Sequence, residues 1–584
     1  LYYYPLLGLL VSLFCAGVVS VMFGLFASNR EIPSRQPLYF SAAAIFLIFP
    51  ILPFLIFDKW LNTGYTSILS ILIIFAVFTI LLTITLAFQW AFRFFVSKIK
   101  LGWRAGGVLL SLFVYVALIL LSMAYPLDVV DLQPYDRQDS NRLEDTANII
   151  LILIDTLRPD CVSPYGCEIN TPVMQEIADN GITFTNSFNN VTWTKPSIAS
   201  ILTSLHPYQH GIEDYTGMIN PESTTLAQVL SDMGYYTVTF QNNPHINTTS
   251  NFHLGFNTFK IRAAKYYHPK LPNFRLSKRH NETVVRFAKY FYPPIVVNYF
   301  YDSGEILSDK AINWIKRNGD KRFFMYLHYM DPHDPYFEHP YTGYQIGPPS
   351  YGRDPDVPSE AQLNELWSLY RGEVEYVDMA IGKLVDHLKE NGMYDQSLIM
   401  VTSDHGEEFY DHGGWGHGTN LYDEQLRQVL LVKLPEPKMK ATVDSSLAES
   451  IDIAPTIVGC VDGEIPAQWS GRDLFDAEPI RWTVSEIGLP KYQAEGIRSI
   501  DEKLWFNSVQ NGKTINLKEY FDIKEDPQEQ NDLSELDAYE KRVSELEDTL
   551  SILKTKLTSS AVEASKIELD EATREQLKAL GYIE

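Results

Sequence analysis

The chain has 584 residues, which predicts two to four domains because a single hydrophobic core rarely grows beyond roughly 250–300 residues. Its formal net charge of −24 argues against a nucleic-acid-binding protein, and it means that an anionic substrate must be held by local groups such as metal ions. Four cysteines are too few for a disulfide scaffold. Whether Cys161 and Cys167 form a small loop disulfide depends on the redox compartment and stays open.

The first 127 residues carry little charge and contain four apolar stretches, at residues 1–28, 38–57, 66–92 and 107–124. Each can cross a bilayer core of about 30 Å, which requires about 20 helical residues. The loops after the first and third stretches are the basic ones, so the positive-inside rule predicts that they are cytoplasmic. We therefore expect a multi-pass protein of the cell membrane in which everything after Ala124 is extracytoplasmic. Because the chain begins without methionine, a further preceding span stays open.

After this transmembrane domain, residues 128–145 are polar and irregular, which is typical of a linker. Apolar strands and amphipathic helices alternate through residues 146–475, which predicts an α/β sandwich. Within it, residues 262–301 form a basic, aromatic insert that suits either contact with lipid headgroups or an ordinary surface role. Residues 476–584 predict a small antiparallel sheet and a charged helical tail. The elements expected in the sandwich are helices 171–180, 225–233 and 360–391, a helix after Thr194, and strands 182–184, 236–241 and 323–336.

Three apolar strands end in residues with carboxylate or imidazole side chains. Functional residues gather at the carboxyl ends of strands in parallel sheets, and these side chains are common metal ligands. One such strand end could equally be a helix cap, but the recurrence predicts a metal site. The residues at these ends and in the glycine-rich loop DHGGWGHG are Asp155, Asp331, His333, Asp334, Asp404, His405, His412 and His417.

The stretch TKPSIASILT predicts a helix with a reactive N-terminus. Pro196 suits the first helical turn, where its missing N–H costs nothing, so Thr194 is expected just before the helix. The unpaired N–H groups and the helix dipole favour an anion there. A hydroxyl at such a site is a candidate nucleophile if a neighbour lowers its pKa. The alternative is an ordinary N-cap threonine.

With these pieces in order, the chain resembles the sulfatase branch of the alkaline phosphatase superfamily. The resemblance covers about residues 147–584. It implies a mixed α/β sandwich with a smaller C-terminal subdomain and a metal-bound nucleophile at a helix N-terminus. The matching stretches are NIILILIDTLRPD, TKPSIASILTS, HYMDPHDPY, EVEYVDMAIGKL, SDHGEEF, GWGHG, IDIAPTIV and LKALGYI.

The resemblance also implies the roles of individual residues. His333 and His417 match positions that hold the ester's oxyanion or assist the leaving group, and together with Asp331 they are candidates for a second metal site. Lys195 and Asn243 are expected to contact the substrate. The expected cofactor is one or two divalent ions, zinc or manganese first, with calcium or magnesium as alternatives. The implied metal ligands, the last of which is also the nucleophile, are Asp155, Asp404, His405 and Thr194.

Departures from the family pattern decide the expected chemistry. Sulfatases carry cysteine or serine at the position of Thr194 and oxidise it to formylglycine, which threonine cannot form because its β-carbon bears a methyl group. Ile198 replaces the family's arginine, QNNPHI replaces its lysine–histidine stretch, and His417 replaces a lysine. In its threonine the chain is similar to phosphoethanolamine and phosphoglycerol transferases and to nucleotide pyrophosphatase/phosphodiesterases.

The sequence thus predicts a membrane-anchored, metal-dependent hydrolase or transferase of phosphate esters that forms a covalent phosphothreonine. Zinc or manganese can lower the pKa of a bound hydroxyl enough to make an alkoxide near neutral pH. The expected substrate is a phosphodiester or phospholipid headgroup, lipid-linked or part of a glycan, and the lipid bilayer is the expected partner, with no nucleic acid. Two alternatives are a sulfuric ester hydrolase (sulfatase) without formylglycine and a catalytically silent membrane binding protein.

Overall fold

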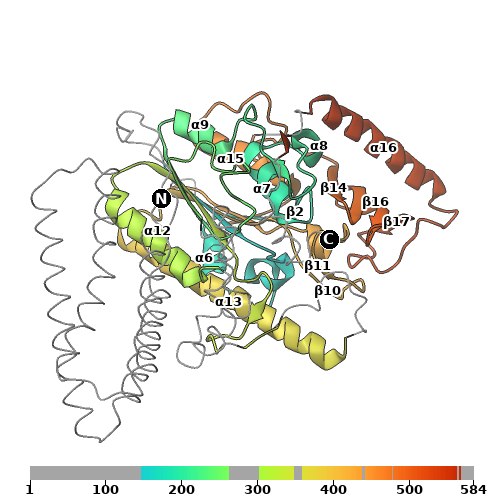
Figure 1. Ribbon diagram of the computed structural model, residues 1–584, viewed down its shortest axis with the longest axis horizontal. Helices are drawn as coiled ribbons and strands as arrows, with labels where there is room; N and C mark the ends of the chain where they lie inside the picture. The colour runs from blue at the N-terminus through green and yellow to red at the C-terminus, as the bar shows by residue number, and fades with distance from the viewer. Residues whose placement is uncertain are drawn as a thin grey trace, which may run out of the picture. The chain divides into compact units, whose positions relative to one another are not determined.

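The computed structural model of the protein describes residues 147–261, 301–342, 344–346, 358–436, 441–476, 478–561 and the backbone of 565–566 (Figure 1). All of them belong to a compact unit that spans Asp128–Glu584. The predicted transmembrane stretches, the linker and the insert, apart from Tyr301, lie outside the described residues. Within the described ranges, no helix is both long enough and apolar enough to span a bilayer.

The fold is built on an eight-stranded mixed sheet in the order β13-β2-β12-β9-β1-β6-β4-β5. Its central strand, β1, is a continuous apolar run buried on both faces, as parallel strands covered by helices require. All neighbouring strands are parallel except β12, which runs antiparallel to β2 and β9. In sheet order the strands are Thr442–Glu449, Ile182–Phe188, Leu430–Lys433, Ser397–Ser403, Asn148–Ile154, Phe323–Tyr329, Tyr236–Gln241 and Thr258–Ile261.

Helices cover both faces of this sheet, as Figure 1 shows. Alternate residues of β1 point to opposite sides: Leu153 packs into the apolar cluster that holds α7, α9 and α15, and Ile152 into the cluster that holds α6, α12 and α13. This arrangement confirms the predicted α/β sandwich. The covering helices are α6 (Pro172–Asp179), α7 (Thr194–Thr203), α9 (Leu226–Asp232), α12 (Gly304–Asn318), α13 (Glu360–Glu390) and α15 (Ile453–Cys460).

Two sequence predictions change in detail, and the pairing of Cys161 with Cys167, left open by the sequence, is resolved. The helix begins at Thr194 itself, and Trp193 is the N-cap residue, so Thr194 lies one position further into the helix than predicted and the alternative of an N-cap threonine is wrong. Thr194 can enter the first turn because the N–H groups of that turn need no helical partner. The apolar run at 323–336 forms a strand only to Tyr329, after which the chain turns. Cys161 and Cys167 carry free thiols, and burial raises the pKa of Cys161 above its usual range.

The C-terminal part is a separate four-stranded antiparallel sheet, as the sequence predicts, with α16 packed on one face. Its other face contributes Trp505 and Phe521 to a cluster with Trp193 and Leu426, which belong to the part built on the eight-stranded sheet, so the small sheet supports the chain just before α7. The sheet and its helix comprise β14 (Thr483–Leu489), β15 (Tyr492–Arg498), β16 (Glu502–Gln510), β17 (Lys513–Asp522) and α16 (Glu540–Ser559).

The remaining described elements are short and lie in connections. They are the 3-10 helices Pro159–Cys161, Ser163–Tyr165 and Ser450–Asp452, the helices α8 (Pro207–His210) and α14 (Asp423–Leu426), and the paired strands β3 (Gly217–Met218) with β18 (Ser565–Lys566), β7 (Tyr336–Phe337) with β8 (Gln345–Ile346), and β10 (Glu408–Phe409) with β11 (Trp415–Gly416).

Candidate active site

The candidate active site lies where the central strands end. Strand β1 pairs in parallel with β9 and β6, and the register places Ile154 opposite both Ser403 and Tyr329. The residues that follow these strand ends are therefore neighbours in space. Asp155 follows β1 and Asp404 follows β9, and both side chains are fully buried.

The structure brings the four predicted metal ligands together. His405 Nε2 lies 3.2 Å from Thr194 Oγ1, 3.4 Å from Asp404 Oδ2 and 3.8 Å from Asp155 Oδ1. The ring is oriented by Nδ1, which donates to the carbonyl of Gly406 at 2.8 Å and so directs Nε2 toward the carboxylates. Burial and a neighbouring imidazole hold the pKa of His405 well below its usual range, which favours the neutral form that ligates metals.

Two buried carboxylate oxygens indicate that a cation would fit between Asp155 and Asp404. Asp155 Oδ1 and Asp404 Oδ2 make no hydrogen bond within the described structure. Burial and the charge of Asp155 raise the pKa of Asp404 well above its usual range, as expected for two carboxylates without a compensating charge. Two carboxylate oxygens and the Thr194 hydroxyl lie within 3.8 Å of His405 Nε2. This donor set suits a divalent cation such as zinc or manganese.

His328 lies next to the two carboxylates, although the sequence analysis does not predict it as a site residue. Its Nε2 lies 3.0 Å from Asp155 Oδ2, and among the described residues the ligand atoms of Asp155, His328 and Asp404 all lie within 4.8 Å of one another. The register pairs His328 with Leu153, so both point to the same face as Asp155. The available signal was a histidine inside a fully buried apolar strand, because such a side chain requires a polar partner.

Asn243 and His328 both act on the Asp155 carboxylate. Asn243 was predicted to contact the substrate, and in the structure its Nδ2 donates to Asp155 Oδ2 at 3.2 Å. Burial raises the pKa of Asp155, but the hydrogen bond from His328 and the nearby imidazoles outweigh burial and bring the pKa below its usual range. The carboxylate is thus held in its ionised, ligating form.

His333 and His417 lie beside His405. The ring centroid of His417 lies 4.2 Å from the ring centroid of His405 and 5.3 Å from that of His333. His417 Nδ1 is 3.0 Å from Glu407 Oε1, and His333 Nδ1 donates to the carbonyl of Asp334 at 2.8 Å. Both imidazoles are therefore oriented by their Nδ1 atoms.

Asp331, the third predicted member of a second metal site, makes its contacts elsewhere. Its Oδ1 accepts from the backbone N–H of Gly304 at 2.8 Å and from the hydroxyl of Tyr341 at 3.4 Å, at the start of α12. Burial and the neighbouring Glu373 raise its pKa to about 7. These contacts hold α12 against the end of β6. Of the three residues predicted for a second metal site, His333 and His417 therefore lie together, whereas Asp331 binds the start of α12.

Lys195 is almost fully buried in the first turn of α7. Its Nζ donates to the carbonyl of Tyr215 at 2.8 Å, and burial lowers its pKa to about 7 although Asp214 acts in the opposite direction. The ring of Tyr215 lies 5.4 Å from His245, whose pKa is lowered by burial and by the charges of Lys195 and His333. His245 therefore belongs to the same electrostatic environment and was not singled out by the sequence.

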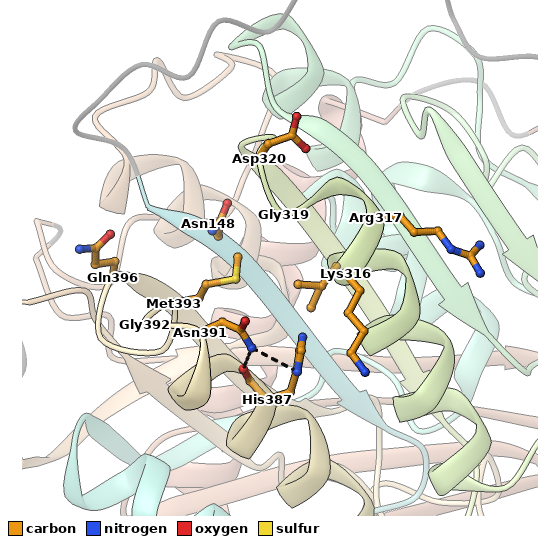
Figure 2. A pocket seen from close by; sticks show the side chains of 11 residues that line it. Asn148, Lys316, Arg317, Gly319, Asp320, His387, Asn391, Gly392, Met393 and Gln396 are labelled. Carbon is orange, nitrogen blue, oxygen red and sulfur yellow. Dashed lines mark hydrogen bonds between the residues drawn. The ribbon is translucent and has the colours of Figure 1, made fainter.

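A polar cavity of about 520 Å³ occupies the opposite end of the sheet (Figure 2). Asn148, the first residue of β1, lines it, whereas Asp155 follows the last residue of that strand. Seven residues of extended chain span about 20 Å, so the cavity is remote from the carboxylates. Its other lining residues come mainly from the C-terminal ends of α12 and α13, among them Lys316, Arg317 and His387.

Comparison with known proteins finds relatives that are similar in sequence and solved structures that are similar in fold. The multifunctional alkaline phosphatase superfamily protein PehA of Trinickia caryophylli is 23% identical over 404 residues, which cover 57% of this chain and 78% of that protein. The arylsulfatase of Clostridium perfringens is 24% identical over 454 residues, covering 68% and 92%. The solved phosphonate monoester hydrolase of Silicibacter pomeroyi superposes with a TM-score of 0.56 at 21% identity, covering 70% and 96%.

The family assignment follows from the extent of the sequence match. The Sulfatase family model matches residues 147–463, more than half of the 584 residues, and the match includes every residue of the site described above. The solved relatives share the fold of the mixed sheet and its helices. The chain therefore belongs to the Sulfatase family of the alkaline phosphatase superfamily, whose enzymes bind a divalent metal.

Proposed function

We propose that the protein is a metal-dependent hydrolase or transferase of phosphate esters, of the phosphodiester or phospholipid-headgroup class, and that Thr194 is its nucleophile. The observation that carries this proposal is the position of Thr194 Oγ1, 3.2 Å from His405 Nε2 at the N-terminus of α7. Threonine supplies a hydroxyl but cannot become formylglycine, and a threonine hydroxyl suits attack on phosphorus through a phosphothreonine.

The residues around Thr194 suit the binding of an anionic ester. The first turn of α7 presents backbone N–H groups and the positive end of the helix dipole, both of which favour phosphoryl oxygens. Asp155, Asp404 and His405 would hold the cation, with Thr194 as the fourth ligand. When bound, a divalent cation lowers the pKa of a hydroxyl and neutralises charge on the phosphoryl oxygens.

His333 is suited to handle the leaving group. Burial lowers its pKa, but Asp334 and the surrounding carboxylates outweigh burial and raise the pKa well above its usual range, which favours the imidazolium. Thr194 first loses its hydroxyl proton to solvent. As the bond from the ionised Oγ1 to phosphorus forms and the bond to the leaving oxygen breaks, His333 Nε2 donates a proton to that oxygen. Water or an acceptor hydroxyl then attacks phosphorus, returns a proton to His333 and releases Thr194.

The relatives support an ester substrate, but they include enzymes of both phosphonate esters and sulfate esters. Solved structures with similar folds include phosphonate monoester hydrolases and an enzyme bound to a disulfated glucosamine. A sulfatase that works without formylglycine is therefore the second candidate function, and it is favoured by the similarity to an arylsulfatase and an N-acetylglucosamine-6-O-sulfatase. Thr194 favours the phosphate ester over the sulfate ester.

We further propose that the catalytic part is anchored by the four apolar stretches of residues 1–127 and works outside the cytoplasm. A lipid-linked phosphate ester would then diffuse in the bilayer next to the domain. The bilayer is thus the proposed partner, and this location is compatible with a headgroup donor.

Trapping the intermediate tests the proposal. Purified full-length protein with Mn²⁺ or Zn²⁺ is mixed with an aryl phosphodiester, quenched in acid and analysed by mass spectrometry. We expect phosphate on Thr194 and a loss of turnover of at least about a thousandfold in Thr194→Ala. Thr194→Ser is the matched control because it retains a hydroxyl nucleophile. Full activity of Thr194→Ala contradicts the mechanism, and faster turnover of an aryl sulfate than of the phosphodiester favours the sulfatase.

A further inference from the structure

The turn that follows β1 is strained. Thr156, directly after Asp155, has φ of 57° and is fully buried. A β-branched residue in the left-handed region is a genuine outlier, because its Cβ crowds the backbone. Such conformations persist only where the surrounding structure holds them, and they concentrate at functional sites.

The strained turn controls both carboxylates of the candidate metal site. Asp155 is attached to it covalently, and the backbone N–H of Thr156 donates to Asp404 Oδ1 at 3.3 Å. The N–H of His405 donates to the same oxygen at 3.0 Å. With Oδ1 held by two donors, Oδ2 of Asp404 is the oxygen that faces His405 Nε2 at 3.4 Å. A change of φ at Thr156 would therefore move Asp155 and release Asp404 together.

One hydroxyl from a distant helix binds this turn on both sides. Tyr370, in the middle of α13, donates its hydroxyl proton to the carbonyl of Thr156 at 2.9 Å and accepts the N–H of Arg158 at 3.0 Å. Tyr370 is fully buried, with its ring centroid 5.8 Å from Tyr336 and 4.7 Å from Phe409. The ring is thus fixed independently of the turn, and its hydroxyl can resist relaxation of the backbone at Thr156.

We propose that Tyr370 is a positioning residue for the metal site: its hydroxyl keeps Thr156 in the left-handed conformation that aligns the carboxylates of Asp155 and Asp404. This inference rests on the metal role given to these two residues in the proposed function. It adds that the geometry of the site is maintained from α13, more than 200 residues away along the chain. It is independent of whether the ester is a phosphate or a sulfate.

Metal binding measured by calorimetry tests the proposal. Mn²⁺ is titrated into metal-stripped, purified full-length protein and its variants. We expect Tyr370→Phe to bind Mn²⁺ about tenfold more weakly, as is common when a residue that supports metal ligands is lost. Adding Thr156→Gly to Tyr370→Phe should restore affinity to within about threefold of the wild type, because glycine adopts a positive φ without strain.

Tyr165→Phe is the matched control. The Tyr165 hydroxyl also accepts a backbone N–H, from Leu430 at 2.7 Å, and donates to a backbone carbonyl, that of Phe184 at 3.2 Å. It joins β2 to β12 and touches none of the proposed metal ligands. Tyr165→Phe should therefore lose a similar amount of stability and bind Mn²⁺ as the wild type does, to within about twofold.

Each outcome bears on the proposal. Wild-type affinity in Tyr370→Phe, or failure of Thr156→Gly to restore it, overturns the positioning role while leaving the metal site intact. Absence of Mn²⁺ and Zn²⁺ binding to the wild type overturns the metal site of the proposed function, and this inference with it. If Tyr370→Phe alone fails to fold, the double variant decides: folding with restored binding supports the role, and failure to fold overturns it.

Discussion

Glu407 illustrates how a single residue orients a side chain of the candidate active site. Its side chain is fully buried, and its two carboxylate oxygens accept from His417 Nδ1 at 3.0 Å and from the Tyr336 hydroxyl at 3.2 Å. With Nδ1–H committed to Glu407, any bond from His417 to a substrate must come from Nε2. Glu407 thus selects the tautomer of the His417 imidazole.

Glu407→Gln should lower kcat/KM for an aryl phosphodiester by about tenfold, with little change in secondary structure. The amide has one acceptor oxygen in place of two and adds an N–H that faces a donor, so the His417 ring loses its fixed orientation. Steady-state kinetics measures the effect. Tyr336→Phe removes only one donor to the same carboxylate and should have a smaller effect. An unchanged kcat/KM in Glu407→Gln contradicts the orienting role.

At the scale of secondary-structure elements, His412 links the glycine-rich loop to the segment after β17. Its ring stacks on Tyr422 with centroids 3.6 Å apart, Nδ1 donates to Glu424 at 2.8 Å and Nε2 to the carbonyl of Glu529 at 3.1 Å. Burial lowers its pKa, but the Glu424 hydrogen bond and charge outweigh burial and raise the pKa from 6.5 to about 9. The folded protein therefore favours the imidazolium at His412.

This raised pKa makes part of the stability depend on pH. Because the folded pKa exceeds the unfolded one, the contribution of His412 is complete below about pH 6.5 and is lost as the pH rises through about 9. His412→Gln should therefore lower the free energy of unfolding by about 2 kcal/mol at pH 6 and by little at pH 10. Urea unfolding of both proteins at pH 6, 8 and 10 tests this. A difference that is equal at all three values contradicts it.

Lys503 joins the C-terminal sheet to α14 through charge. It is almost fully buried in β16, and its Nζ lies 3.1 Å from Asp423 and 2.5 Å from Glu529. Lys503→Met should destabilise the protein by about 3 kcal/mol in denaturant unfolding, because it leaves the buried carboxylate of Glu529 without its cation. The control is Lys518→Met, whose half-exposed pair with Glu547 spans 3.5 Å and should change stability by less than about 1 kcal/mol. Equal effects of the two substitutions would contradict this account.

At the scale of the whole molecule, we predict that α16 lies outside the cell and that the loop after the third apolar stretch lies in the cytoplasm. In a cysteine-free background, Ile552→Cys on the exposed face of α16 should react with a membrane-impermeant maleimide in intact cells. Lys98→Cys, in the predicted cytoplasmic loop after the third apolar stretch, should react only after permeabilisation. The reverse pattern would contradict the predicted orientation. Equal labelling of both positions in intact, unpermeabilised cells would also contradict it.

The sequence by itself determined the sandwich, its antiparallel C-terminal sheet and the strand ends that carry Asp155 and Asp404. Continuous apolar runs mark strands buried on both faces, and polar residues directly after them must lie at one edge of the sheet. These are local signals, and they were sufficient to predict that the carboxylates of Asp155 and Asp404 lie close together. Thr194 was predicted just before the helix, whereas the structure places it at the first position of α7.

Only the tertiary structure decided which other residues belong to the site. His328 joins Asp155 because two strands pair in register, whereas Asp331 turns away to hold the first residue of α12. Tyr370 contacts Thr156 although the two residues are 214 positions apart in the sequence, and the hydrophobic periodicity of a segment cannot predict such a contact. The physical reason is that burial forces each polar group to find a partner, but the partner is chosen by strand register and helix packing, which join residues far apart in the chain.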